Sequence, residues 1–163
     1  MRTKTIFLAA ALGVVGALSA SAQITNVYSV NAVGYTTVTV AANKFKLIAN
    51  QLNTTNNTIG SLLANVPDGS SFFRWTGSGY AQYDYILGIG WLPDGNASLA
   101  PGQGGFLKNP TGSTLRLTVV GEVPQGTITN VVSANYAIVS SVIPQACDIT
   151  TFGFPGVDGD SVF

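Results

Sequence analysis

The feature that most constrains this chain is a repeat of its own sequence at a spacing of about ninety residues. The repeated stretches are residues 37–39 (TVT) with 127–129 (TIT), 45–50 (FKLIAN) with 136–141 (YAIVSS), and 68–73 (DGSSFF) with 158–163 (DGDSVF). Matches that keep one order and nearly one spacing indicate a duplicated structural unit. We therefore expect a complete β-module at residues 35–122 and the start of a second, incomplete copy at residues 123–163.

One further match departs from this spacing. Residues 24–31 (ITNVYSVN) resemble residues 128–135 (ITNVVSAN) at a spacing of 104. Two interpretations remain open: each module begins with a similar connector strand, or both segments are only strand edges rich in Thr, Val and Asn. On the first interpretation, residues 23–34 form an N-terminal connector strand, and the first module carries an added hairpin through Gly34.

The first 22 residues have the layout of a secretory signal peptide. Arg2 and Lys4 give a positively charged start, residues 6–18 are apolar, and residues 20–22 (ASA) form a cleavage site. The apolar stretch is shorter than the ~20 residues of a membrane-spanning helix. We predict that residues 1–22 are removed and that the protein is secreted, either extracellular or at the cell surface. The alternative is an uncleaved N-terminal anchor.

The composition of the mature chain limits its partners. Without residues 1–22, five basic and seven acidic residues remain, and charged residues make up only 9% of the full sequence. No basic surface can form, which excludes nucleic acid and anionic lipid as partners. No later stretch is apolar enough to span a membrane once the signal peptide is removed. Because 46% of the sequence is hydrophobic, the chain is expected to fold.

Short apolar runs, interrupted every eight to twelve residues by turn-forming residues, predict an all-β fold. Leu115, Leu117 and Val119 alternate with polar residues, as in an antiparallel strand with one buried face. This pattern favours a sandwich or barrel-like module. The candidate strands are residues 24–30, 35–41, 45–50, 71–75, 80–85, 105–108, 114–120, 127–132 and 137–142. We expect the core to include Leu47, Ile48, Leu115 and Leu117.

One segment breaks the strand pattern. Residues 58–66 (TIGSLLANV) place their four apolar side chains at the i, i+3, i+4 and i+7 positions of a helix. Thr58 is suited to cap the first turn, and Pro67 ends the segment. The sequence therefore predicts one short helix between two strands.

The side chains that most often carry catalysis are scarce. The sequence contains no histidine, and Glu122 is its only glutamate. A Ser-His-Asp triad, a histidine general base and a histidine metal ligand are thus excluded. Glycoside hydrolysis needs two carboxylates across a cleft, and the spacing of Asp84 and Asp94 gives no sign of such a pair. We predict a non-catalytic protein without a cofactor; a hydrolase fragment with its active site outside this sequence is the remaining catalytic hypothesis.

Aspartates occur mainly beside Gly in turn-like stretches. Residues 67–69 and 93–95 both read PDG, and residues 157–160 read VDGD. Pro fixes one backbone angle of a tight turn, Asp bonds to its own backbone, and Gly adopts positive φ, so these stretches predict turns. Calcium binding is the alternative, with Asp158 and Asp160 the best candidates because their carboxylates are close in sequence.

Aromatic residues form the other notable group. On the predicted strands, Phe73 and Trp75 share one face, and so do Tyr83 and Tyr85; Trp91 follows shortly after. Packing between sheets is the first interpretation, because aromatic side chains favour strands and bury large areas. The alternative is a ligand-binding platform formed by Trp75, Tyr83, Tyr85 and Trp91, whose exposed rings would stack on sugars.

Several of these stretches together resemble a module of bacterial surface proteins. The stretches are residues 45–52 (FKLIANQL), the short helix, 73–75 (FRW), 90–91 (GW) and 99–106 (LAPGQGGF). That module has an aromatic-x-Leu-Ile strand, a Pro-Gly-x-Gly-aromatic loop and a closing strand that ends in Gly, here Gly121. The chain also resembles uncharacterised secreted β-module proteins of Verrucomicrobia-like environmental bacteria. The resemblance covers most of residues 35–163; it implies the architecture and implies no catalytic residues.

These observations favour a secreted, non-catalytic structural or adhesive module of a cell-surface, matrix or appendage protein. The expected partners are other copies of the chain, or an extracellular glycan or protein surface. The alternative function is a carbohydrate-binding module that uses exposed Trp and Tyr side chains.

Overall fold

The computed structural model describes residues 32–146, 148–151, 153–154 and 156–163. Its elements are β1 (Ala32–Val40), β2 (Phe45–Ala49), α2 (Ile59–Leu62), β3 (Ser71–Trp75), β4 (Tyr80–Ile86), β5 (Gly90–Leu92), β6 (Gly104–Lys108) and β7 (Leu115–Val123). The predicted all-β fold with one short helix is confirmed. The predicted signal peptide, the candidate strand at 24–30 and most of the predicted connector strand at 23–34 lie outside the described residues.

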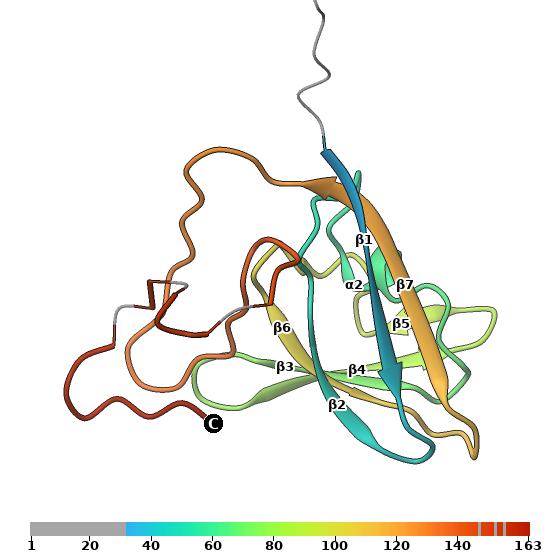
Figure 1. Ribbon diagram of the computed structural model, residues 1–163. Helices are drawn as coiled ribbons and strands as arrows, with labels where there is room; N and C mark the ends of the chain where they lie inside the picture. Colours follow the sequence, from blue (N-terminus) through green and yellow to red (C-terminus); the bar gives the residue numbers. More distant parts are fainter. Residues whose placement is uncertain (1–31, 147, 152, 155) are drawn as a thin grey trace, which may run out of the picture. The chain divides into compact units, whose positions relative to one another are not determined.

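The strands pair antiparallel in two sheets (Figure 1). β1 and β7 form a two-stranded ribbon, in which Ala32 lies opposite Val123 and Val40 lies opposite Leu115. The other strands form a five-stranded sheet in the order β2-β6-β3-β4-β5. This arrangement is sandwich-like, since apolar side chains of the ribbon and of the five-stranded sheet belong to one buried cluster.

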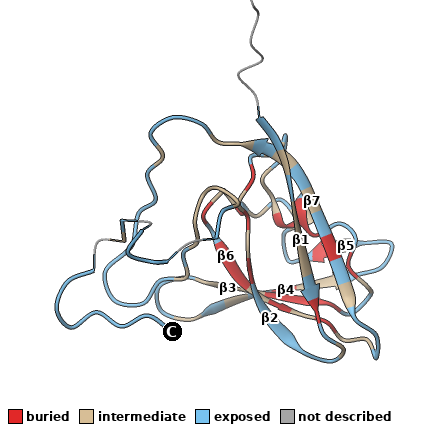
Figure 2. Cartoon of the chain, in the orientation of Figure 1, coloured by how far each residue is buried: buried red, intermediate tan, exposed pale blue. Residues whose placement is uncertain are grey.

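The core is built from one face of each sheet and from the helical segment. Phe72 and Leu107 contribute from the five-stranded sheet, Val40 and Leu117 from the ribbon, and Ile59 from α2. Figure 2 shows the buried residues concentrated in these elements, while most of the chain after β7 is exposed. The hydrophobic core therefore belongs to residues 32–123, the segment that contains every strand of the described part of the chain.

The short helix forms where the apolar spacing predicted it. The hydroxyl of Thr58 accepts a hydrogen bond from the amide of Ser61 at 3.2 Å, which satisfies a donor left free at the helix start. The four apolar side chains of this segment, Ile59, Leu62, Leu63 and Val66, are all buried. The segment thus closes one side of the core.

The predicted core is correct for some residues and wrong for one. Ile48 and Leu117 are buried, and half-buried Leu115 packs against the core. The prediction for Leu47 is wrong, because its side chain is 49% exposed. Successive side chains of a strand point to opposite faces, so Ile48 and Leu47 cannot both point inward.

The predicted strands of the second copy are also wrong. Residues 127–132 and 137–142 are irregular except for a single bridge between Val139 and Gln103. Their composition favours strands, but strand propensity describes fit to a paired, half-buried surface. In the described part of the chain these residues are mostly exposed, with Val131 at 77%. They therefore lack a paired, half-buried surface on which to form strands.

Candidate functional site

The four aromatic residues of the predicted platform lie on two different faces of the five-stranded sheet. Tyr83 and Trp91 are buried in the core, at 7% and 5% exposure, and Tyr85 is half-buried against it. The indole nitrogen of Trp91 donates to the carbonyl oxygen of Leu63 at 3.2 Å. Trp75 lies three residues after buried Phe72 on β3, so it points to the opposite, outer face. The structure therefore does not bring the four rings together at one surface.

The outer face carries a different aromatic group, which follows from the strand register. Residues directly opposite in antiparallel strands share a face. Phe73 lies opposite Phe106 on β6, Trp75 lies opposite Tyr80 on β4, and Phe106 lies opposite Leu47 on β2. We use the name outer aromatic face for the large apolar residues that point outward from these strands, namely Phe45, Leu47, Phe73, Trp75, Tyr80 and Phe106.

The rings of the outer aromatic face contact one another. The ring centroids of Phe45 and Phe73 are 5.8 Å apart, those of Trp75 and Tyr80 are 5.1 Å apart, and those of Tyr80 and Phe106 are 6.0 Å apart. The interplanar angles are 54°, 66° and 65°, so neighbouring rings are tilted or edge-on. Such pairs are mutually attractive beyond the area they bury. The face is a packed cluster of rings.

This cluster is accessible from solvent. Phe45 is 56% exposed and Tyr80 is 52% exposed, whereas Phe73, Trp75 and Phe106 are half-buried. Large apolar side chains that are exposed together, as opposed to scattered singly, are characteristic of contact surfaces. The outer aromatic face is therefore the strongest candidate contact surface of the five-stranded sheet.

Polar groups border the outer aromatic face. The ammonium of Lys108 lies 5.8 Å from the ring centroid of Phe45. Asp84 lies opposite Ser71 on the neighbouring strand. Hydrogen bonding from the side chains of Ser71 and Gln82, with a smaller contribution from the charge of Lys108, lowers the pKa of Asp84, while partial desolvation acts in the opposite direction. Asp84 is thus held in its ionised form at the border.

The chain after β7 contacts one end of the outer aromatic face. The indole nitrogen of Trp75 donates to the carbonyl oxygen of Tyr136 at 2.8 Å. Nearby, the amide of Ser140 donates to the carbonyl oxygen of Gly102 at 2.9 Å, next to the bridge between Gln103 and Val139. Residues 136–141 are those that repeat the sequence of β2. A segment of the predicted second copy therefore lies against the five-stranded sheet.

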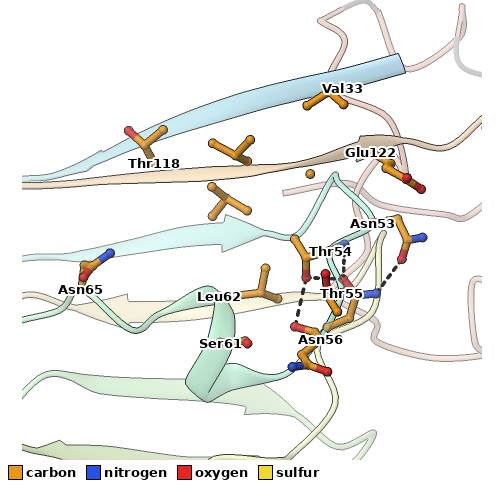
Figure 3. Close-up of a pocket in the computed structure, with 14 residues that line it drawn as sticks. Val33, Asn53, Thr54, Thr55, Asn56, Ser61, Leu62, Asn65, Thr118 and Glu122 are labelled. Atoms are coloured by element: carbon orange, nitrogen blue, oxygen red, sulfur yellow. Dashed lines mark hydrogen bonds between the residues drawn. The ribbon is translucent and has the colours of Figure 1, made fainter. Parts of the chain in front are cut away.

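A polar cleft lies on another part of the molecule, between β7 and the loop that follows β2 (Figure 3). Its volume is about 770 Å³, within the range of small-molecule sites. Residues 53–57 (NTTNN) line one side and residues 118–122 of β7 line the other. Ser61, Leu62 and Asn65 of the helical segment also line the cleft. Most of the lining side chains are amides and hydroxyls.

Hydrogen bonds hold the loop of this cleft in shape. The Asn57 side-chain oxygen accepts from the Thr54 amide and hydroxyl, both at 3.0 Å, and its nitrogen donates to the Asn53 side-chain oxygen at 2.7 Å. The backbone of Asn53 exchanges two hydrogen bonds of 2.8 Å with that of Glu122. A Cβ at Gly121 would lie 2.8 Å from the Asn53 carbonyl oxygen, so this close approach requires glycine.

Among the residues that the structure describes, no cluster of three or more Cys, Asp and Glu side chains is placed to hold a metal ion. No helix of the described part has the length and apolar character needed to cross a membrane. The turn at residues 67–69 is held because the Asp68 carboxylate accepts the amide of Leu87 at 2.8 Å.

Comparison of the chain with models of known families, with curated proteins and with solved structures gave no match. The site must therefore be interpreted from its own geometry. Sequence reasoning missed Phe45, Tyr80 and Phe106 as surface residues. For Tyr80 and Phe106, the spacing of two from the polar residues Gln82 and Lys108 was a usable signal, whereas Phe45 shares its face with apolar Leu47 and carried no such signal. Sequence reasoning also missed the cleft, for which the polar run at 53–57 was the only local sign.

Proposed function

We propose that this chain is a secreted, non-catalytic structural or adhesive module of a cell-surface, matrix or appendage protein. Its contact surface is the outer aromatic face, and its partner is another copy of the same module. Secretion rests on the layout of residues 1–22, and the module architecture is supported by the two-sheet fold.

One observation carries the proposal: the repeated segment 136–141 already lies at one end of the outer aromatic face, through the bond from Trp75 to the Tyr136 carbonyl. Contact between a module and sequence from its repeat is thus possible at this surface. The remaining exposed part, at Phe45, Leu47 and Tyr80, offers the apolar area that protein interfaces bury at their centres.

The geometry favours protein contact over the alternative use of these aromatic residues in sugar binding. Trp91 and Tyr83 are buried, so their rings are not available to a polysaccharide in solution. The rings of Trp75 and Tyr80 are inclined at 66° to each other and present no common plane. A ridged aromatic surface fits complementary side chains better than a flat chain of sugar rings.

Sedimentation velocity of the mature protein, compared across concentrations, tests the proposal. The wild type should self-associate, and Leu47→Asp should abolish the association, because a buried charge without a partner is strongly unfavourable at an interface. Ile89→Asp is the matched control, since Ile89 is also exposed but lies in the β4–β5 turn, at the opposite edge of the sheet from β2. A wild type that stays monomeric, or equal effects of both substitutions, would refute this function.

A further inference from the structure

We propose that the polar cleft beside β7 is a binding site for a neutral saccharide. This inference goes beyond the structural role, because the cleft shares no lining residue with the outer aromatic face. It also differs from the sugar platform expected from the sequence, which used Trp and Tyr side chains. The ligand class follows from the amides, hydroxyls and backbone groups that line the cleft and from the absence of Lys and Arg among its lining residues.

The loop side of the cleft presents preorganised amides and hydroxyls. The side-chain oxygen and nitrogen of Asn57 both hold the loop, and the nitrogen fixes the side-chain oxygen of Asn53. The side chains of Thr55, Asn56 and Asn65 are exposed and make no hydrogen bond to another described residue. Side-chain amides both donate and accept, which matches sugar hydroxyls. A loop that is already ordered loses little entropy when it binds.

The strand side of the cleft presents backbone groups. The Glu122 amide and carbonyl bond to Asn53, on the edge of β7 that faces away from β1. In an antiparallel strand the backbone groups alternate between the two edges. The register with β1 is continuous, so the amides and carbonyls of Val120 and Thr118 point to the same outer edge as those of Glu122. The cleft therefore has donors and acceptors on both sides.

The charges of the cleft narrow the ligand class. No Lys or Arg lines it, and its single charged residue is the carboxylate Glu122. Phosphates, nucleotides and uronic acids would find no cation among the lining residues. Calcium sites usually provide several carboxylate or carbonyl oxygens in one cage, whereas this cleft provides one carboxylate. A neutral ligand rich in hydroxyl groups suits the remaining amides, hydroxyls and backbone groups.

An extended peptide is the competing occupant, since the strand pairings among the described residues leave Thr118 and Val120 without a neighbouring strand on the outer edge of β7. Only Thr118 and Val120 direct backbone groups of that edge into the cleft, because the bridge from Asn53 to Glu122 closes its end. Added strands normally pair over about five or more residues and place alternate side chains in pockets. The short edge and the polar lining favour a saccharide over a peptide.

The test is a titration of the ¹⁵N-labelled mature protein with cellohexaose, xylohexaose and mannohexaose, each up to about 10 mM to capture a Kd of ~1 mM. At least one neutral hexaose should shift amides at residues 53–57 and 118–122 saturably. The double variant Asn56→Ala/Asn65→Ala should weaken that binding about ten-fold, as expected for lost hydrogen bonds. Asn96→Ala, an exposed amide away from the cleft, is the matched control and should leave it unchanged.

Several outcomes would overturn the proposal. They are no shift with any hexaose, shifts confined to Trp75 and Tyr80, or an equal response to trigalacturonate or calcium chloride. Binding that survives the double variant while the fold is intact would also exclude these amides as the site. Saturation of the same amides by a β-forming peptide in place of the sugars would assign the cleft to strand addition. Because self-association is measured separately, the saccharide site can fail while the structural function stands.

Discussion

The two faces of the five-stranded sheet use the same strands for different purposes. On the inner face Phe72 and Leu107 are fully buried, whereas on the outer face Phe45 and Tyr80 remain more than half exposed. Both faces are rich in aromatic and aliphatic side chains, so residue type alone does not separate them. The difference lies in what covers each face: the ribbon and α2 cover the inner one, and the described chain after β7 reaches only one end of the outer one.

Apolar side chains in a strand can therefore serve two purposes. Side chains that point inward stabilise the module by leaving water. Side chains that point outward contribute little to the isolated module but are available for a partner. A sheet that is apolar on both faces can therefore form the core with one face and contact a partner with the other.

The largest expected effect compares two phenylalanines of the opposite faces. Phe72→Ala should lower the free energy of unfolding by about 3–5 kcal/mol, because it opens a cavity at a fully buried site. Phe45→Ala should cost less than about 1 kcal/mol in the monomer, since its ring is already largely in water. Urea denaturation at low protein concentration measures both values. Similar losses in the free energy of unfolding for the two substitutions would contradict the difference between the two faces.

A smaller loss of stability is expected for a substitution at Gly105, whose backbone lies against Phe72 and Phe73. A Cβ added at Gly105 would lie 2.7 Å from the ring carbon Cζ of Phe72 and would also collide with the Phe73 carbonyl oxygen. Gly105→Ala should therefore destabilise the module by about 2–3 kcal/mol through overpacking. Gly112→Ala is the control, because open space surrounds that position, and it should change stability by less than about 0.5 kcal/mol.

The smallest effect concerns pH at the border of the outer aromatic face. The folded-state pKa of Asp84 is lowered, chiefly by the Ser71 side chain and then by Gln82. The ionised carboxylate therefore contributes stability above its usual pKa of 3.8, and this contribution is lost as pH falls through the lower folded value. The gain is modest, because solvent screens a partly exposed group. Carbon-13 NMR titration should give Asp84 a lower pKa in wild type than in Ser71→Ala; equal values would contradict this cause.

Much of the fold was predictable from sequence, because periodicity and turn residues act locally. The strands over 45–50, 71–75 and 80–85 were placed within a residue or two, and the helix begins after its predicted cap Thr58. The helix ends at Leu62, earlier than the predicted segment, which ran to residue 66. β5 was missed, since three residues, Gly90–Leu92, are too short to show a period. The strands at 127–132 and 137–142 were predicted wrongly, because their composition is suited to pairing but no extended partner exists in the described part.

The candidate sites were harder to predict than the fold. Alternation in a strand separates two faces but does not say which one is covered, and so Leu47 was placed in the core. Trp75 and Trp91 looked equivalent by sequence, yet one points outward and the other is buried. The cleft depends on the approach of Asn53 to Gly121, residues 68 positions apart in sequence. Long-range register decides all three cases.

Hydroxyl-radical footprinting of the mature protein, at a dilute and at a concentrated condition, tests the central claim most directly. The account predicts that Phe45, Leu47 and Tyr80 react in dilute solution and become protected on concentration. The core residue Phe72 should stay protected throughout, and exposed Ile89 should stay reactive throughout. Unchanged reactivity of Phe45, Leu47 and Tyr80 under conditions in which the protein associates would show that another surface makes the contact, and would contradict the account.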